Sequence, residues 1–436
     1  MQAANAIIEK NHQRLGKNLW TDLGEGELID IYDASDEYDE ASFIANYLQQ
    51  WHRTIDEATG DKKLKDIAIL YRSNAQSRAL EEVMIRNKIP YQIYGGQRFY
   101  ERLEIKNVIA YLRLLVNVDD DNALERIINV PPRGIGARSV EKIREHARAM
   151  NQSLWQAMSS IVQRNIFGTK AHHALEKFML LVQSLKGASV QLALHELVEE
   201  VIERTGIKQF HVAEGGERGA ARVENIEELV SACHHFSAAD DGVLPLVQFL
   251  AAASLDAGDQ QADANQDAVQ MMTLHSAKGL EFPLVILAGV ENNLFPHMMA
   301  EQEGNHEEER RLCYVGITRA MRKLLISYAQ SRRLHGQERY NGASTFVREI
   351  PQHLSRGVRL GHNETISPNH SLLESTGNIV AHDDLLSIGQ LVKHPVFGTG
   401  IILNYEGSGE HLRVEVNFEG EGNMWLIYVY ARLSPV

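Results

Sequence analysis

The sequence predicts an α/β fold in which a helical domain interrupts a parallel-sheet domain and a small β-barrel follows. Residues 1–95 and 266–350 alternate apolar, strand-like runs with helical segments. Residues 96–265 instead carry apolar side chains at three- and four-residue spacing, which is typical of helices. Residues 386–436 alternate polar and apolar positions between Gly-rich turns, which indicates short strands. One α/β domain built from two separate stretches is therefore expected.

The first stretch begins with a helix near residues 2–13 and an acidic strand-and-turn region. The next predicted elements are a helix at 39–53, a strand at 66–71, a helix at 77–87 and a short strand at 91–94. Gly95 and Gly96 then mark the turn into the inserted domain.

Amphipathic helices are predicted within the insertion, and strands return after it. The expected helices lie at 103–116, 139–150, 174–185, 190–205 and 224–236, and the expected strands at 269–274, 284–290 and 323–328. Residues 351–385 are polar and aperiodic, which predicts a flexible linker. Residues 386–436, with the alternating run 412–418, form the predicted barrel.

Composition favours a reduced, cytoplasmic setting. The two cysteines, Cys233 and Cys313, cannot form a disulfide framework. The longest apolar runs are far shorter than a membrane span, and the N-terminus lacks the features of a signal peptide. We therefore expect no membrane partner.

The net charge of −14 is unevenly distributed. Residues 21–61 carry twelve acids against one arginine, whereas residues 62–106 carry ten bases against five acids and residues 310–339 eight bases against one acid. A basic groove on an acidic protein is one interpretation, because local potential governs contact with phosphates. Solvated charged faces are the other.

Two segments concentrate the chemistry. Residues 273–282 form a polar loop ahead of an apolar strand, and residues 308–320 form an arginine-bearing helix that leads into another strand. Ligands of parallel α/β sheets bind at the carboxyl ends of the strands. We therefore expect the His, Lys, Glu and Arg side chains of both segments at that edge, where they suit a polyanion and a sugar.

These segments resemble motifs V and VI of superfamily 1 DNA helicases of the UvrD/PcrA/Rep group. Further matches in the family's order lie at residues 69–78, 94–102, 132–136 and 392–400. The resemblance implies a second RecA-like domain, an inserted helical domain and a Tudor-like barrel. It also implies an ATP-dependent 3′–5′ DNA helicase or translocase that uses ATP and Mg²⁺ in DNA repair and replication.

The resemblance assigns nucleotide contacts to the two motifs. Arg319 matches the arginine finger, which stabilises charge on the transferred phosphoryl group. Glu281 matches the glutamate that binds ribose hydroxyls, and Lys278 and Gly279 would lie near the phosphates. Gly316 permits close packing of the helix. No residue is assigned to a resident metal.

Single-stranded DNA contacts are assigned to two strand ends. Arg72 and Asn74 follow the strand at 66–71, and Thr273 and His275 follow the strand at 269–274. Hydroxyl and imidazole groups can bond phosphate oxygens, and an imidazole can stack on a base. Phe346 either offers a stacking face or packs in the core.

Duplex contact is assigned to the turn at 131–139, which resembles a helix–hairpin–helix. Backbone N–H groups at such a glycine-containing turn can approach a phosphate without reading sequence. The residues assigned to this contact are Arg133, Gly134, Ile135, Gly136 and Arg138.

In the barrel, aromatic residues either fill the core or form a peptide-binding face. They are Phe397, Tyr405, Phe418 and Trp425. The resemblance implies a docking surface for a repair protein or RNA polymerase.

A Walker A loop, which the motor of this group requires, is not found in the sequence. Asp36 to Asp39 imitate a Walker B motif, but no buried apolar run leads into them. We therefore expect the chain to be inactive alone and to need a Walker A-bearing N-terminal half, in cis or in trans. The alternatives are a non-catalytic DNA-binding and docking module, or the relic of a split gene.

Overall fold

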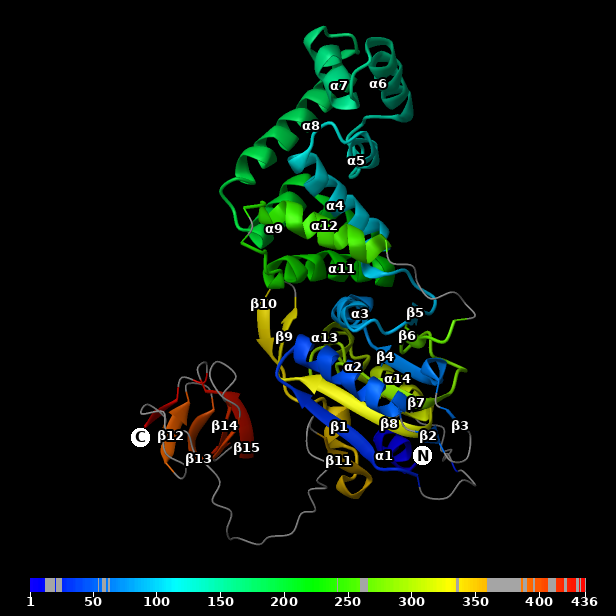
Figure 1. Cartoon of the computed structure of the whole chain (residues 1–436), viewed down its shortest axis with the longest axis vertical. Coiled ribbons are helices and arrows are strands. Elements are labelled where there is room, and N and C mark those ends of the chain that lie inside the picture. Colours follow the sequence, from blue (N-terminus) through cyan, green and yellow to red (C-terminus); the bar gives the residue numbers. More distant parts are fainter. Residues whose placement is uncertain are drawn as a thin grey trace. The chain divides into compact units, whose positions relative to one another are not determined.

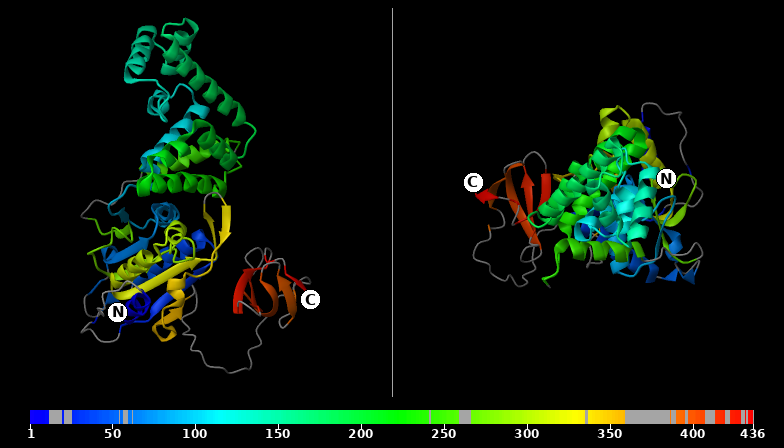
Figure 2. Two further views of the ribbon diagram at one scale, coloured as in Figure 1. Left: turned by 180° about the vertical axis from the view of Figure 1, so that it is seen from behind. Right: turned by 90° about the horizontal axis from the view of Figure 1, so that it is seen from above.

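A computed structural model describes most of the chain (Figures 1 and 2). The described residues are 1–11, 20, 26–53, 55–56, 60–61, 63–240, 242–258, 266–334, 337–358, 386, 390–394, 397–406, 413–418, 422–428, 431 and 433–435. They divide into two compact units, residues 1–366 and 367–436.

The first unit contains an α/β part and a helical part. The first α/β stretch contains α1 (Gln2–Glu9), β1 (Ile29–Ala34), α2 (Glu37–Arg53), β2 (Ile55–Asp56), β3 (Gly60–Asp61), η1 (Leu64–Asp66), β4 (Ile67–Tyr71), η2 (Asn74–Gln76), α3 (Ser77–Arg86) and β5 (Tyr91–Ile93). The helical part contains η3 (Phe99–Glu101), α4 (Leu103–Val116), α5 (Asp121–Ile127), α6 (Ala137–Met150), α7 (Leu154–Gln163), α8 (Thr169–Ala188), α9 (Leu194–Thr205), α10 (Ile207–Glu214), α11 (Gly216–His235) and α12 (Pro245–Gly258). The second α/β stretch contains β6 (Val269–Thr273), β7 (Phe282–Leu287), α13 (Met298–Gln302), α14 (His306–Thr318), β8 (Ala320–Ala329), β9 (Ser331–Leu334), β10 (Gln337–Tyr340), α15 (Thr345–Arg348), η4 (Gln352–Leu354) and β11 (Ser355–Gly357).

A seven-stranded parallel sheet joins the two α/β stretches. Its strand order is β11-β1-β8-β7-β4-β6-β5, and every neighbouring pair is parallel. β5 and β6, which flank the helical part in sequence, are adjacent in the sheet. The prediction of a parallel α/β sheet formed by both stretches is confirmed.

Helices cover both faces of the sheet, and its central strands are therefore buried on both sides. Ile67 and Ile69 of β4 pack with α2 and α3, whereas Ala68 and Leu70 pack with α1 and α14. Gly316 lets α14 approach closely, as expected: a Cβ at this position would lie 2.6 Å from a methyl group of Leu274.

Two details of the α/β part differ from the sequence prediction. Residues 355–357 lie in the predicted linker, yet they form β11, which pairs with β1 and completes the sheet. The predicted linker also contains η4, whereas its residues 359–385 lie outside the described residues. Asp36 caps α2, because its carboxylate accepts from the backbone N–H groups of Tyr38 and Asp39, and this agrees with its rejection as a Walker B acid.

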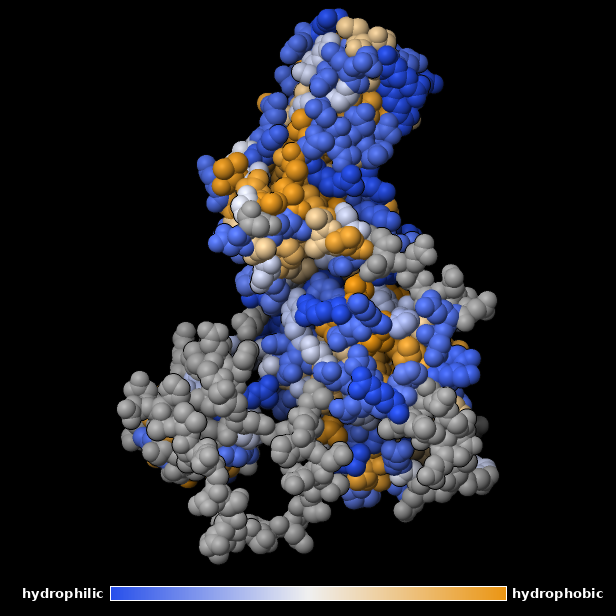
Figure 3. Space-filling view, in the orientation of Figure 1, coloured by the Kyte–Doolittle hydropathy of each residue, from blue (hydrophilic) through white to orange (hydrophobic). Residues whose placement is uncertain are grey.

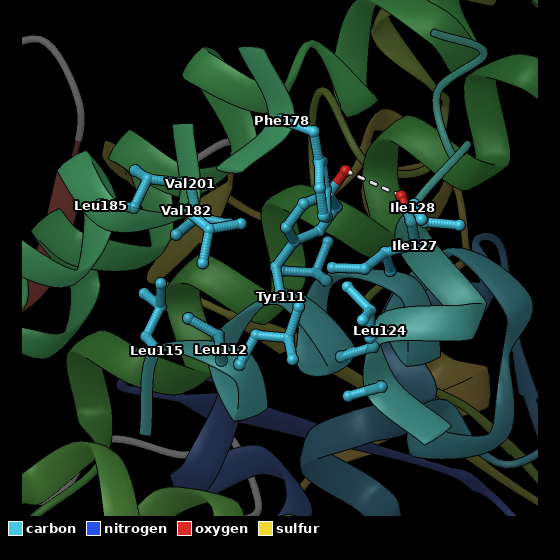
Figure 4. Packing of buried hydrophobic residues seen from close by; sticks show 14 of the residues in the cluster. Tyr111, Leu112, Leu115, Leu124, Ile127, Ile128, Phe178, Val182, Leu185 and Val201 are labelled. Carbon is cyan, nitrogen blue, oxygen red and sulfur yellow. Dashed lines mark hydrogen bonds between the residues drawn. The ribbon is translucent and has the colours of Figure 1, made fainter. Parts of the chain in front are cut away.

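The helical part has its own apolar core, shown in Figure 4. Side chains from α4, α5, α8 and α9 converge there, including the fully buried Tyr111, Phe178 and Val201. The Tyr111 hydroxyl donates to the Val130 carbonyl at 2.5 Å and lies 3.5 Å from the Ile127 carbonyl. This core is distinct from the two cores on the faces of the sheet.

The second unit is a five-stranded antiparallel sheet. Its strands are β12 (Leu391–His394), β13 (Gly398–Glu406), β14 (Arg413–Phe418), β15 (Gly422–Ile427) and β16 (Ser434–Pro435), in the order β15-β14-β13-β12-β16. Phe418 is buried with Val392 and Val416, and Phe397 is partly buried against them. Trp425 is half-buried, and the side chain of Tyr405 lies outside the described set.

The surface of the helical part is uneven in polarity (Figure 3). Val190, Leu244 and Leu255 are exposed by 84%, 67% and 73% on this part of the chain. Across the described residues, we find no helix with both the length and the apolar character needed to cross a membrane.

Candidate functional site

The predicted site residues divide between the two edges of the sheet. Arg72 and Thr273 lie at the carboxyl edge, because Tyr71 at the end of β4 pairs with Thr273 at the end of β6. Glu281 and Arg319 precede β7 and β8, whose first residues, Phe282 and Ala320, are paired at the amino edge. The expectation that all these side chains share the carboxyl edge is therefore wrong. The loop at 274–281 carries the chain back across the sheet, and the six residues of β7 separate the two edges by roughly 17–20 Å.

At the amino edge, local acceptors hold the Arg319 guanidinium. Its Nη1 donates to the Leu280 carbonyl at 2.8 Å, its Nε to the Val315 carbonyl at 3.1 Å and its Nη2 to Thr318 Oγ1 at 3.1 Å. Arg319 is the C-cap residue of α14, and its own carbonyl accepts from the Phe282 N–H at 2.9 Å. A guanidinium has five N–H groups, so two of them are not used by these bonds.

The motif V residues approach the same edge. Glu281 follows Leu280, the residue whose carbonyl accepts from Arg319, and its side chain is exposed. Lys278 is also exposed, and Gly279 has a φ of +87°, a backbone conformation that glycine adopts without strain. The cation of Arg319 and the carboxylate of Glu281 thus lie on neighbouring strand starts.

At the carboxyl edge, Glu309 of α14 binds Arg72. Arg72 Nη2 and Nε donate to Glu309 at 2.8 and 2.9 Å, and the His297 N–H donates to the same carboxylate at 3.0 Å. The side chains of Arg72 and Glu309 are 21% and 5% exposed. Bidentate binding of this kind fixes the orientation of a guanidinium.

A second acid reaches this edge from the helical part. Glu224 of α11 accepts a short hydrogen bond from Ser73 Oγ and lies 3.4 Å from His297 Nε2. Sequence reasoning identified neither Glu224 nor Glu309. The acidic start of the helix at 308–320 was the available signal for Glu309, whereas nothing near Glu224 in the sequence indicated its distant partners.

The other three residues assigned to single-stranded DNA lie at this edge. Asn74 is half-buried, and its carbonyl accepts from Arg102 at 3.0 Å. Thr273 Oγ1 lies 3.0 Å from Ser276 Oγ. His275 is exposed, yet partial burial of its ring lowers its pKa and the Arg72 guanidinium acts in the same direction.

Phe346, the fifth residue in that set, does not lie on the surface. It is 0% exposed, and its ring packs against those of Phe295 and His306 at centroid distances of 5.4 and 5.5 Å, with the Arg310 guanidinium 5.4 Å from its ring. The core alternative therefore holds, and this structure offers no stacking face at Phe346.

The turn at 131–139 presents its glycines but not all of its predicted side chains. Gly134, with a φ of +81°, Gly136 and Arg138 are exposed, and Gly136 is the N-cap of α6. Ile135 is 1% exposed and belongs to the core. Arg133 Nη2 donates to the Tyr111 hydroxyl at 2.6 Å, so its guanidinium points inward, contrary to the prediction of a DNA contact.

Many bases of the two basic segments are also turned inward. Arg78, Arg310, Lys323 and Arg332 are at most 6% exposed, and each of them pairs with acids. Arg332, for example, binds Glu291 and Glu40 in the interior. These cations can be buried because carboxylates pair with them. The number of bases in the two segments is therefore larger than the number of free positive charges that they contribute to the surface.

Comparison with known proteins decides the family. The model of the UvrD-like helicase C-terminal domain matches residues 1–331. The chain belongs to the UvrD-like helicase family. It is 46% identical to DNA helicase II of Escherichia coli over the whole of this chain and 60% of that protein, and 38% identical to the ATP-dependent DNA helicase PcrA of Staphylococcus aureus over the same shares. It thus spans about 60% of the length of these relatives.

Within this UvrD-like chain, α14 touches both edges. Its thirteen residues extend about 20 Å. Glu309, near its start, binds Arg72, and the C-cap residue Arg319, just after its last residue, binds the Leu280 carbonyl. No group of three or more His, Cys, Asp or Glu side chains among the described residues is arranged to hold a metal ion.

Proposed function

We propose that this chain is the C-terminal portion of an ATP-dependent 3′–5′ DNA helicase or translocase of the UvrD type. In this proposal the α/β part is the second RecA-like domain, α4–α12 form its inserted helical domain, and residues 386–436 form a Tudor-like barrel. Membership of the UvrD-like family and the seven-stranded parallel sheet support this assignment.

The amino edge would complete an ATP site shared with a Walker A-bearing half. Arg319 would direct its two remaining N–H groups at the γ-phosphate, and Glu281 would accept from ribose hydroxyls. Lys278 and Gly279 would face the phosphates. Magnesium, held by the phosphates and by the other half, would neutralise charge on the transferred group.

The carboxyl edge would hold single-stranded DNA. Arg72 is already oriented by Glu309, and Asn74, Thr273 and His275 surround it with groups that bond phosphates or stack on bases. Gly134, Gly136 and Arg138 would contact the duplex ahead of it, whereas Arg133 and Ile135 would shape that turn from within. The barrel would dock a repair protein or RNA polymerase.

One observation carries the proposal: the fixed guanidinium of Arg319 lies beside Glu281 at one edge, while the other end of the same helix binds Arg72. A module that binds DNA without turnover has no use for a preorganised cation at the edge opposite its DNA contacts. This arrangement supports a motor rather than a passive docking module.

The test is DNA-stimulated ATP hydrolysis by the chain alone and by the chain mixed with a separately prepared Walker A-bearing half. We expect ATP hydrolysis only in the mixture. Arg319→Ala should lower its rate by about 10³-fold or more, because arginine fingers contribute at least this factor. Arg322→Ala, at an exposed base three residues away, serves as the control.

Turnover by the chain alone would contradict the expected incompleteness. An active mixture that tolerates Arg319→Ala would contradict the role of this arginine. An inactive mixture that still binds DNA in a salt-sensitive way would favour the docking module.

A further inference from the structure

The helical part contains a cavity that the proposed motor does not use. Its volume is about 950 Å³, and it lies between α4, α5, α10 and the segment 129–132, which leads into the turn at 131–139, with one side chain from α11. Small-molecule sites typically measure roughly 300–1,000 Å³. One face of α4 forms a wall, because Leu103, Lys106, Asn107 and Ala110 are spaced at three- and four-residue intervals.

Two buried polar side chains line this cavity without full hydrogen bonding. Asn107 is 4% exposed and makes no hydrogen bond to a described residue, but its amide atoms are not fully enclosed. His211 is 1% exposed; its Nδ1 lies 3.2 Å from Glu214 Oε2, and its Nε2 has no partner in the same part of the chain. Leaving one such group unpaired costs about 1–3 kcal/mol. The unpaired ring nitrogen of His211, with the Asn107 amide lining the same cavity, suits a ligand that pairs with both.

The charge of the lining is positive. Lys106 and Arg126 make no ion pair with any described residue, and Arg113 and Arg222 add two further bases. The lining acids, Glu125 and Glu214, are bound by Arg144 at 2.5 Å and by Arg222 at 2.7 Å. The unpaired bases therefore favour an anion.

Apolar groups form the rest of the wall. Ile109, Val130 and Phe210 line the same space as the two free bases. A ligand with a phosphate group and a flat, weakly polar body matches both surfaces.

We propose that this cavity binds a small phosphorylated ligand of the nucleotide class. Lys106 and Arg126 hold the phosphates, Asn107 and His211 bond the polar edge of the body, and Phe210 packs against its face. The site lies wholly within the helical part, apart from the sheet edge that carries Arg319.

Calorimetric titration of the full chain with ATP and with pyrophosphate tests the site. Arg319→Ala is the starting variant, so that the proposed motor site does not contribute. We expect binding of both probes, reduced by about tenfold or more in Lys106→Ala/Arg126→Ala, which corresponds to about 1.4 kcal/mol. Lys177→Ala, at an exposed base on α8, leaves binding unchanged. Failure of both probes to bind, or equal binding by the double variant, overturns the proposal.

Asn107→Leu separates a ligand contact from a structural role. Because Asn107 makes no hydrogen bond to a described residue and is 4% exposed, an apolar group of similar size should leave the melting temperature equal or higher, while ATP binding weakens. A lower melting temperature with unchanged ATP binding overturns the assignment. So does a Lys106→Ala/Arg126→Ala variant that loses duplex DNA binding while it keeps ATP binding, since the cavity bases then serve DNA.

Discussion

At Phe346 the surrounding side chains decide between two roles that the sequence left open. The ring is fully buried against Phe295, His306 and the Arg310 guanidinium. Its removal leaves a cavity in the core on the α14 face of the sheet.

We expect Phe346→Ala to lower the free energy of unfolding by about 3–5 kcal/mol, as for other buried aromatic residues. Denaturant unfolding followed by circular dichroism measures this loss. Tyr340→Ala, at a tyrosine that is 74% exposed, is the control and should change stability by less than about 0.5 kcal/mol. A stable Phe346→Ala variant with weakened single-stranded DNA binding would instead restore the stacking role.

The Arg72–Glu309 pair is a second residue-scale test. Truncating Arg72 alone leaves the Glu309 carboxylate, which is 5% exposed, with a single backbone partner, whereas Arg72→Ala/Glu309→Gln removes both charges. We expect a double-mutant cycle to give a coupling energy of about 1–3 kcal/mol. Chemical denaturation of the four chains measures it, and additive effects would show that the pair contributes no net interaction.

The type of a residue does not reveal whether its side chain is buried, as two arginines of one turn show. Arg133 and Arg138 occupy the same short turn and have the same chemistry. Arg133 nevertheless bonds the Tyr111 hydroxyl, whereas Arg138 is exposed. The partners of Arg133 come from distant positions, so no local pattern distinguishes the two arginines.

Among the elements, α11 connects the helical part to the sheet through polar groups. Glu224, Asn225 and Glu228 bond Ser73, Arg102 and Arg78, respectively. Glu224 and Glu228 are acids in buried or half-buried pairings. The energy of these two pairings therefore depends on whether the acids are protonated.

Glu228 makes this dependence measurable. Burial raises its pKa to about 6 from an ordinary value of 4.5, against the opposing effect of Arg78. Because the folded chain binds this proton more tightly than the unfolded chain, its contribution to stability is complete below about pH 4.5 and is lost as the pH rises through about 6. We expect the free energy of unfolding of the parent chain, relative to Glu228→Gln, to increase when the pH falls from 7 to 5. Urea titrations at three pH values test this, and parallel pH profiles would contradict it.

Strand-forming runs in the α/β part were predictable, but the path between them was not. The apolar runs at 66–71, 269–274 and 323–328 correspond to β4, β6 and β8 within a few residues. The eight residues at 274–281, however, are long enough either to stay at one edge or to cross the sheet. Packing of Leu274 and Ala277 in the core on the α14 face decides for crossing.

At the scale of the whole molecule, β11 is the last of the described strands to join the sheet of the first unit. β11 pairs with β1, the Val358 N–H donates to the Ile31 carbonyl at 3.0 Å, and Arg356 binds Asp30 at 2.7 Å. A chain of residues 1–358 retains these contacts, and one of residues 1–350 loses them.

We therefore expect residues 1–358 to keep the melting temperature of the first unit, and residues 1–350 to melt several degrees lower. Calorimetry of both truncated chains beside the full chain tests this. Equal melting temperatures would show that β11 adds no stability.

The sequence predicted the end of the α/β domain at residue 350, because residues 351–385 lack periodicity and are rich in polar residues. A three-residue edge strand is too short to produce a periodic signal, and β11 forms because the open side of β1 is available. The pairing of the two distant α/β stretches, by contrast, was predictable from their shared apolar pattern.

The separation of the sheet edges limits how ligands there can influence one another. Charged groups roughly 17–20 Å apart are separated by more than the Debye length at physiological salt. Their direct charge interaction through solvent is therefore weak. If ATP hydrolysis takes place at the amino edge as proposed, its effect on the other edge would be transmitted by displacement of packed atoms. Gly316 brings α14 against Leu274 and Leu287, so a shift of that helix moves the side chains beneath it. In mechanical terms, a rigid α14 would transmit displacement between the edges, and the closeness of its packing at Gly316 would set how much of that displacement is transmitted.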